Sequence, residues 1–288
     1  MLEMGKRLLI FSLFLILLAP VSAQRSQILA DTLHSEILGV DKSFTVYLPA
    51  GFDTSGEEYP VLYLLHGAFG KNTDWGKQGN MKRIADQVMS AGFALPMVVI
   101  MPDARGVNAN GAGENMGYYD TPTWLYEKFF FEEFMPAVEK KYRIRSDKGS
   151  RAIAGLSMGG GGSISYAQHH PELFSSVCSL SGLVGEPSRL RSGADYVESF
   201  RESVVANAPQ RFLETADKEQ LAALKTVRWY LDCGDDDFLA EDNVRFFVTM
   251  KKLGIPLQFR MRDGGHSWEY WQSALPSVLQ FVSVGFAR

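Results

Sequence analysis

Short apolar runs recur along this chain of 288 residues, and segments with helical spacing separate most of them. The runs lie at 44–48, 60–65, 97–101, 151–154, 177–180, 227–231 and 257–261. Several are apolar on both faces, which is typical of strands that helices cover on both sides. Apolar residues at i, i+3 and i+4 predict helices over 81–91, 125–142 and 242–253. This alternation predicts an α/β fold with a mostly parallel central sheet and helices on both faces.

The composition is that of an ordinary globular protein, with 46% apolar and 22% charged residues. The formal net charge is -4, and no long basic run is present. This charge pattern argues against a nucleic-acid partner, which would require a clustered basic face. The two cysteines, Cys178 and Cys233, lie in apolar segments and are predicted to be buried free thiols.

The motif G-L-S-M-G occupies residues 155–159, directly after the run that ends at Ala154, and a helical pattern begins at Gly160. In a strand–turn–helix context, G-x-S-x-G places its serine on a sharp, strained turn with the hydroxyl exposed. Glycines lack Cβ atoms, so the strand and the helix can approach closely. The helix N-terminus adds partial positive charge where an oxyanion would form. The motif therefore predicts that Ser157 is a nucleophile.

A serine hydroxyl needs an adjacent base to become a good nucleophile. Among the five histidines, only His266 follows an acid candidate that itself follows Ser157. The order Ser, acid, His is typical of the fold in which this motif occurs. His266 lies in the segment G-G-H-S-W, just past the last apolar run. We therefore predict His266 as the general base and expect Trp268 to contact substrate.

Four carboxylates compete for the role of the acid in the segment D-C-G-D-D-D-F-L at 232–239. Asp232 precedes the turn, whereas Asp235 and Asp236 lie in it, where we expect solvation. Asp237 is followed by two apolar residues that can pack down. The acid needs a fixed, partly buried position, which favours Asp237. Spacing alone does not separate Asp237 from Asp235.

An oxyanion hole needs two preorganised backbone N–H donors. One is expected from Met158, the residue after the nucleophile. The other is expected from the loop H-G-A-F-G at 66–70, which follows an early apolar run. We select Ala68 as this second donor, with Phe69 as the next choice. The ring of His66 is expected to brace the loop rather than act as a second base.

Two long segments interrupt the alternation of strands and helices. One, over 103–120, is rich in glycine and asparagine and ends near Tyr118 and Tyr119. The other, over 183–226, is polar and partly helical. Both follow strand ends at the edge where open α/β sheets bind ligands. We expect them to wall the site within one catalytic domain over 24–288, the first through Tyr118 and Tyr119, the second as a small cap-like insertion.

The N-terminus has the three parts of a secretory signal. A basic pair at Lys6 and Arg7 precedes an apolar run over 8–19, and small residues occupy the ends of 21–23. The run is shorter than the roughly 20 residues of a membrane span. We predict a signal peptide over 1–23, cleavage before Gln24, and export to the periplasm or beyond, with no membrane span left.

Several segments together carry a family resemblance. They are Y-L-L-H-G at 63–67, M-P-D at 101–103, G-L-S-M-G-G at 155–160, C-G-D-D-D-F-L at 233–239 and G-G-H-S-W at 264–268. With them, the chain resembles the esterase D branch of the α/β-hydrolases, which includes feruloyl and acetyl-xylan esterases, S-formylglutathione hydrolases and mycolyltransferases. The resemblance implies the α/β-hydrolase fold. It places the acid at Asp237 and the oxyanion donors at Met158 and at Ala68 or its neighbour. The chain departs from the family at 104–116 and 183–226, so the substrate does not carry over.

These residues and the resemblance lead us to expect a secreted serine carboxylesterase that acts through an acyl-enzyme. The expected substrates are short-chain acyl esters or acyl and feruloyl esters of carbohydrates, with no metal or organic cofactor. An acyltransferase that uses the same triad and a sugar acceptor is the alternative. A binding module without activity and a peptidase are further rivals, since a fold alone does not establish an activity.

Overall fold

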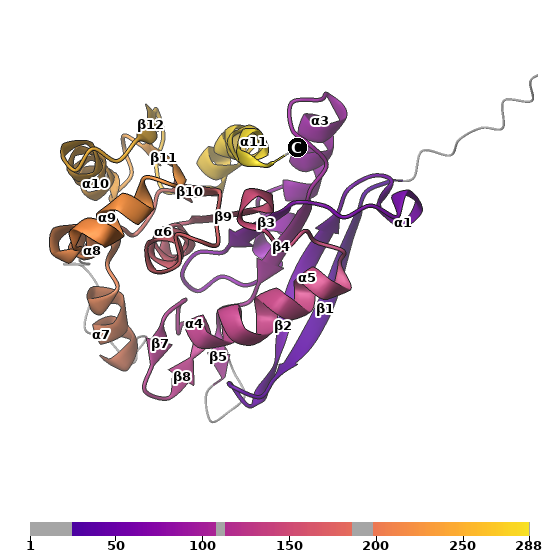
Figure 1. The fold of residues 1–288 in the computed structure, drawn as a ribbon, viewed down its shortest axis with the longest axis horizontal. Coiled ribbons are helices and arrows are strands. Elements are labelled where there is room, and N and C mark those ends of the chain that lie inside the picture. Colours follow the sequence, from indigo (N-terminus) through magenta and orange to yellow (C-terminus); the bar gives the residue numbers. More distant parts are fainter. Residues whose placement is uncertain (1–24, 108–112, 186–197, 288) are drawn as a thin grey trace, which may run out of the picture.

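An eight-stranded sheet runs through the centre of the molecule (Figure 1). Its strand order is β1-β2-β4-β3-β9-β10-β11-β12 in this computed structural model, which describes residues 25–107, 113–185 and 198–287. The strands are β1 (Gln27–Ser35), β2 (Val40–Leu48), β3 (Val61–Leu65), β4 (Val98–Pro102), β9 (Arg151–Leu156), β10 (Ser176–Leu180), β11 (Arg228–Gly234) and β12 (Leu257–Arg262). Strand β2 is antiparallel to both β1 and β4, and all other neighbours are parallel. The mostly parallel sheet predicted from the sequence is confirmed.

Helices cover both faces of this sheet. One face packs against α5 (Met135–Lys141), α6 (Met158–His169) and α10 (Ala240–Lys252), and the other against α3 (Met81–Ser90) and α11 (Trp268–Gly285). The shorter elements are α1 (Phe52–Ser55), α2 (Asp74–Lys77), α4 (Tyr126–Phe129), a π-helical turn (Phe130–Phe134) and a 3-10 turn (Lys148–Ser150). Two small hairpins pair β5 (Gly106–Val107) with β6 (Gly113–Glu114) and β7 (Asp120–Thr121) with β8 (Trp124–Leu125).

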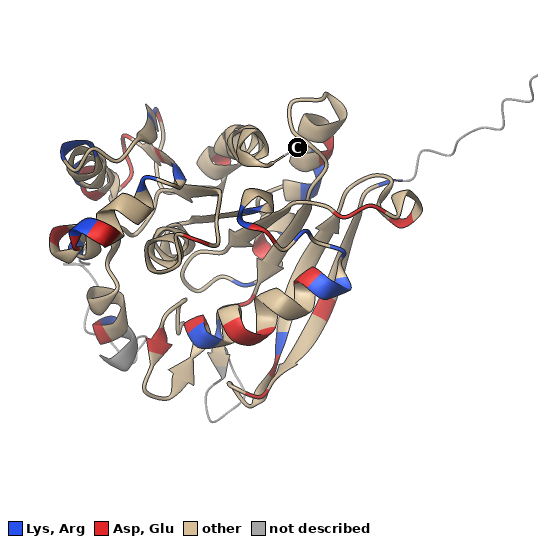
Figure 2. Ribbon diagram, in the orientation of Figure 1, with Lys and Arg blue, Asp and Glu red and all other residues tan. Residues whose placement is uncertain are grey.

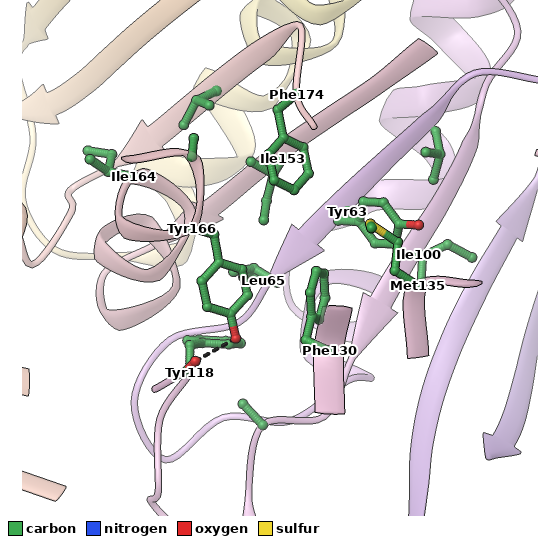
Figure 3. Packing of buried hydrophobic residues seen from close by; sticks show 14 of the residues in the cluster. Tyr63, Leu65, Ile100, Tyr118, Phe130, Met135, Ile153, Ile164, Tyr166 and Phe174 are labelled. Atoms are coloured by element: carbon green, nitrogen blue, oxygen red, sulfur yellow. Dashed lines mark hydrogen bonds between the residues drawn. The ribbon is translucent and has the colours of Figure 1, made fainter. Parts of the chain in front are cut away.

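The central strands are apolar on both sides because each side faces a different core. In β3, Val61, Tyr63 and Leu65 belong to the cluster under α5 and α6, whereas Leu62 and Leu64 belong to the cluster under α3 and α11. Figure 3 shows the first cluster, with the side chain of Tyr63 among those of neighbouring strands and helices. Burial on both faces therefore explains why these strands read as continuous apolar runs.

The structure differs from the predictions in three elements. Strand β1 was not expected because most of its residues are exposed at the sheet edge. Helix α11 was not expected either, and it carries Pro276 within its length. The helix predicted over 125–142 is present, but it consists of α4, the π-helical turn and α5 in succession.

The predicted insertion over 183–226 contains three short helices in its described part. They are α7 (Glu198–Ala206), α8 (Pro209–Thr215) and α9 (Lys218–Leu224). In Figure 1, α8 lies beside α6 and α10, α9 lies near α6, and α7 lies near β7. The predicted signal peptide, 1–23, lies outside the described residues, as do residues 108–112 and 186–197 within the two long segments.

Charged residues of both signs are interspersed over the outer helices in Figure 2. No helix among the described residues is long and apolar enough to cross a bilayer. Both Cys178 and Cys233 are buried free thiols, as predicted.

One charged side chain lies deep beneath the loop that follows β4. Lys42 of β2 is only 5% exposed, and its Nζ donates a hydrogen bond to the carbonyl of Arg105. The ammonium also lies 5.3 Å from the ring centroid of Trp124 and 5.7 Å from that of Tyr126. Burial lowers the pKa of Lys42 to about 8, because nearby Asp103 offsets only part of the desolvation.

This lowered pKa makes stability depend on pH in a defined direction. Below pH 8 the Lys42 amine is protonated in both folded and unfolded chains, so it does not make the free energy of unfolding depend on pH. Between pH 8 and about 10.4 the unfolded chain keeps a proton that the folded chain has lost, so the free energy of unfolding rises with pH. The rise is at most about 1.4 kcal/mol per pH unit.

We therefore expect Lys42→Met to remove this rise. Urea unfolding at pH 7, 8, 9 and 10 measures it, and Lys252→Met on the exposed surface of α10 serves as the control. The difference in unfolding free energy between wild type and Lys42→Met should increase from pH 8 to 10. A constant difference across this range would contradict the prediction.

Candidate active site

Ser157 occupies a sharp turn between β9 and α6. Its backbone has φ 54° and ψ -119°, a sparsely populated conformation that costs about 1–3 kcal/mol for a residue with a Cβ. A Cβ added at Gly159 would lie 2.4 Å from the carbonyl oxygen of His66, and one at Gly155 would lie 2.3 Å from the carbonyl oxygen of Gly159. The turn therefore requires glycine at both positions, which is the steric role that the motif predicts.

The structure brings the predicted nucleophile, base and acid together. The Nε2 atom of His266 lies 3.0 Å from Oγ of Ser157, and its Nδ1 atom lies 2.9 Å and 3.1 Å from the two carboxylate oxygens of Asp237. An ionised carboxylate can only accept hydrogen bonds, so Nδ1 carries the proton of the neutral ring. Nε2 is then free to accept the proton of the Ser157 hydroxyl. This is the arrangement that activates a serine.

The Asp237 carboxylate is held in a fully buried position. Its side chain is 0% exposed, and the backbone N–H of Leu239 donates to Oδ1 at 2.9 Å. Burial raises the pKa of Asp237, but hydrogen bonds from His266, the Leu239 amide and the Ser181 hydroxyl outweigh it and hold that pKa below its ordinary value. Asp237 is therefore ionised at neutral pH and accepts the Nδ1 proton of His266.

The other three carboxylates of this segment face elsewhere. Asp232 is buried and accepts hydrogen bonds from the hydroxyls of Tyr230 and Tyr270, at 2.8 Å and 2.6 Å. Asp235 and Asp236 are exposed in the turn, as expected from the sequence. Their carboxylates cluster with that of another exposed residue, Asp263, within 4.8 Å. Exposed acidic groups of this kind are common without an ion, so we assign this cluster no metal-binding role.

Two backbone amides are available near the nucleophile. Within the described residues, the N–H groups of Met158 and Ala68 have no hydrogen-bond acceptor. The N–H of Phe69 does have one, because it donates to Oδ1 of Asn115 at 3.1 Å. This bond argues against Phe69, the second choice made from the sequence, as an oxyanion donor. Ala68 and Met158 remain the predicted pair. The sequence gives no signal for Asn115, because its contact with Phe69 joins two segments that are 46 positions apart along the chain.

His66 braces the loop that carries Ala68, as predicted. Its ring is 2% exposed, with Nδ1 lying 2.8 Å from the carbonyl oxygen of Gly67 and Nε2 accepting the N–H of Ala104 at 2.9 Å. Burial lowers the pKa of His66, and accepting a bond at Nε2 also requires the neutral ring. The ring therefore links the loop after β3 to the loop after β4.

The predicted substrate contacts of Tyr118 and Tyr119 need correction. Tyr118 is 0% exposed and donates its hydroxyl to the carbonyl of His66 at 2.9 Å, and Tyr119 is 4% exposed. Figure 3 shows Tyr118 among core residues, next to Tyr166. Both tyrosines therefore support the site from below instead of lining it. Trp268 is partly buried, with its ring centroid 5.4 Å from that of Trp75.

Two exposed aromatic side chains flank the site instead. Phe69, on the loop after β3, is 64% exposed and has a left-handed backbone at φ 59°. Phe238, next to the acid, is 61% exposed, and its ring centroid lies 4.5 Å from that of His266. A bulky residue with positive φ is a backbone outlier, and such outliers cluster at functional sites. The sequence shows both phenylalanines, but only the fold reveals that their side chains are exposed, on the loop after β3 and on the loop that carries the acid.

Backbone hydrogen bonds join the loops that carry Ser157, Asp237 and His266. Ser157 donates its N–H to the carbonyl of Leu180 at 2.9 Å, and Ser181 donates to the carbonyl of Asp232 at 2.8 Å. Beyond β11, the N–H of Asp236 donates to the carbonyl of Gly264 at 3.1 Å. The loops after β9, β10, β11 and β12 are therefore connected side by side at the carboxyl edge of the sheet, where open α/β sheets bind ligands.

Comparisons with known proteins agree with this geometry. The family model described as "Putative esterase" matches residues 35–282. A solved ferulic acid esterase is 43% identical to the chain, covers 92% of it and is itself covered over its full length, with a TM-score of 0.86.

Two curated relatives add to this result. An endo-1,4-beta-xylanase/feruloyl esterase of Xylanibacter ruminicola is 33% identical over 164 residues, which are 56% of this chain and 22% of that protein. The chain therefore matches about a fifth of that relative's length. An acetyl esterase of Caldicellulosiruptor saccharolyticus is 24% identical over 80% of the chain and 86% of its own length.

Proposed function

Because the chain belongs to the esterase family and is a carboxylic ester hydrolase, we propose that it works through an acyl-enzyme formed on Ser157. The observation that carries this proposal is the 3.0 Å contact between Oγ of Ser157 and Nε2 of His266. The base is in turn oriented by Asp237 at 2.9 Å. Nucleophile, base and orienting acid within hydrogen-bond reach are the signature of covalent catalysis by serine.

In the first half of the reaction, Ser157 Oγ attacks the ester carbonyl carbon while its proton passes to Nε2 of His266. The carbonyl oxygen gains the negative charge, and the N–H groups of Met158 and Ala68 stabilise it. The ionised Asp237 stabilises the imidazolium. When the tetrahedral intermediate collapses, the C–O bond to the alcohol breaks and His266 returns the proton to that alcohol.

In the second half, a water molecule attacks the acyl carbon as His266 takes one of its protons. The same two amides stabilise the second oxyanion, and collapse breaks the bond to Ser157 Oγ. His266 returns the proton to Ser157, and the carboxylic acid leaves. A sugar hydroxyl in place of water would give acyl transfer, which product analysis with added sugars distinguishes from hydrolysis.

The direct test is Ser157→Ala. We expect kcat with p-nitrophenyl acetate to fall by about 10⁴-fold or more, because no other group supplies the nucleophile. A fluorophosphonate probe should label the wild type and not the variant. Ser90→Ala, at an exposed position of α3, is the matched control and should keep full activity. Equal rates for the wild type and Ser157→Ala would refute the mechanism.

We further propose that the preferred acyl group is aromatic, as in feruloyl esters of carbohydrates. The support comes from Phe69 and Phe238, whose exposed rings lie on the predicted oxyanion loop and on the acid loop, the latter against His266. Exposed apolar rings beside a reactive group provide faces on which an aromatic ring can stack. The names of two relatives, a ferulic acid esterase and a xylanase/feruloyl esterase, point to the same substrates.

A pair of substrates tests this preference. We expect Phe238→Ala to lower kcat/KM for methyl ferulate by about 10-fold, since an aromatic pair contributes about 0.5–1.5 kcal/mol. The value for p-nitrophenyl acetate should change by less than about 3-fold. Phe93→Ala is the matched control, because Phe93 is 67% exposed in the loop that leads into β4. Equal losses with both substrates would contradict aromatic selectivity.

We also infer that residues 1–23 direct export and that 24–288 form the mature catalytic domain, with 183–226 as its insertion. The basic pair, apolar run and small residues before Gln24 support this inference. The first residue of protein recovered from the periplasm or medium should be Gln24, by N-terminal sequencing. Leu15→Arg, which interrupts the apolar run, should keep the protein in the cytoplasm. Exported protein that retains Met1 would contradict cleavage.

A further inference from the structure

Ser181 lies at the end of β10, between the strand that leads to the nucleophile and the strand that leads to the acid. Its side chain is 0% exposed, and its backbone N–H donates to the carbonyl of Asp232 at 2.8 Å. The preceding residue, Leu180, accepts the N–H of Ser157 at 2.9 Å. Ser181 is therefore fixed by backbone contacts within the group of loops that form the site.

The backbone of Ser181 is in the left-handed region, at φ 48°. A residue with a Cβ is disfavoured there, whereas glycine adopts the same conformation without cost. The next residue is Gly182, so a glycine is already used where this bend requires it. A serine at a strained and fully buried position indicates that its hydroxyl is needed.

The hydroxyl of Ser181 is bonded to the helix that follows the base. Nε1 of Trp271 donates to its oxygen at 3.0 Å, which leaves the hydroxyl proton free to be donated. The Ser181 hydroxyl also contributes to the lowered pKa of Asp237.

Trp271 also contacts the base itself. Its ring centroid lies 4.9 Å from that of His266 at an interplanar angle of 87°, an edge-to-face arrangement. Trp271 lies in the first turn of α11, which begins two residues after His266. One indole therefore limits the tilt of the imidazole with its ring and orients Ser181 with its N–H group.

We propose that Ser181 and Trp271 are positioning residues for ester hydrolysis, in a relay that runs from the Ser181 hydroxyl through the Trp271 indole to the imidazole of His266. The proposal rests on the proposed function, because it assigns a role relative to the base His266. The Ser181 hydroxyl holds the indole through its N–H group, and the edge-to-face contact of the indole holds the imidazole that must reach Ser157.

Two substitutions at Ser181 separate the effect of the hydroxyl on activity from the effect of the strained backbone. Both Ser181→Ala and Ser181→Gly remove the hydroxyl, but only the glycine variant also relieves the left-handed backbone. We expect both to lower kcat for p-nitrophenyl acetate by about 10-fold or more, because small displacements of catalytic groups are costly. The KM should change by less than about 2-fold, and Ser181→Gly should unfold at a temperature no lower than that of Ser181→Ala.

A double-mutant cycle tests the connection to Trp271. Trp271→Phe removes the N–H donor and keeps an aromatic ring against His266. If both residues act through one relay, the double variant Ser181→Ala/Trp271→Phe should lose little more kcat than the more impaired single variant. Ser179→Ala is the matched control on β10, because Oγ of Ser179 has no hydrogen-bond partner among the described residues. This control should keep the wild-type kcat.

The outcomes separate this proposal from the proposed function. Activity retained by Ser157→Ala would overturn the acyl-enzyme, and the relay with it. If Ser157→Ala is inactive while Ser181→Ala and Ser181→Gly keep wild-type kcat, only the relay is overturned. A loss of kcat in Ser181→Ala together with wild-type kcat in Ser181→Gly would also overturn the relay, since backbone strain and not the missing hydroxyl would then explain the loss. Additive losses in the double variant would overturn the connection to Trp271.

Discussion

The turn at Ser157 is the constraint on which the site depends. Its backbone is sterically disfavoured, so it can persist only where neighbouring segments determine it from several sides. Glycines at 155 and 159 let β9 and α6 approach to distances that any side chain would prevent. The carbonyl of Ser157 accepts the N–H groups of Gly161 and Leu183, at 3.1 Å and 2.9 Å. The fold thus holds one hydroxyl in a position that local preference alone would not choose.

Buried polar groups around this turn divide into two supports. On one side, Lys42 holds the carbonyl of Arg105, and the adjacent amide of Ala104 is bonded to His66, beside the oxyanion loop. On the other side, the hydroxyl of Ser181 accepts the indole N–H of Trp271, whose ring packs against His266. Burying a polar group without a hydrogen-bond partner costs free energy, so each support favours a single arrangement of its loop. The nucleophile lies between them.

The sequence was sufficient for the parts of this picture that depend on local pattern. Continuous apolar runs predicted the parallel strands because those strands are buried on both faces, and G-x-S-x-G predicted the turn because its glycines are sterically required. The order of residues along the chain favoured His266. The two apolar residues after Asp237 favoured that acid over its exposed neighbours, but only Leu239 packs down, since Phe238 is 61% exposed. All three side chains meet in the structure.

The remaining features depend on contacts between distant segments. Strand β1 escaped prediction because an exposed edge strand lacks a strong apolar pattern. Tyr118 looked like a surface residue in a glycine-rich loop, yet its ring fills the space beside α6, where a Cβ on Gly162 would lie 2.9 Å from it. The bond from Phe69 to Asn115 joins residues 46 positions apart. Periodicity and spacing carry no information about such long-range pairs.

The backbone bonds between adjacent loops have a consequence for how proteins of this shape diversify. Main-chain atoms, whose chemistry is the same for every residue, secure the separation of the loops that carry Ser157, Asp237 and His266. The outward side chains on those loops, such as Phe238, do not hold the loops together and can therefore vary. Substrate preference can therefore drift through surface replacements while the reactive geometry is inherited unchanged.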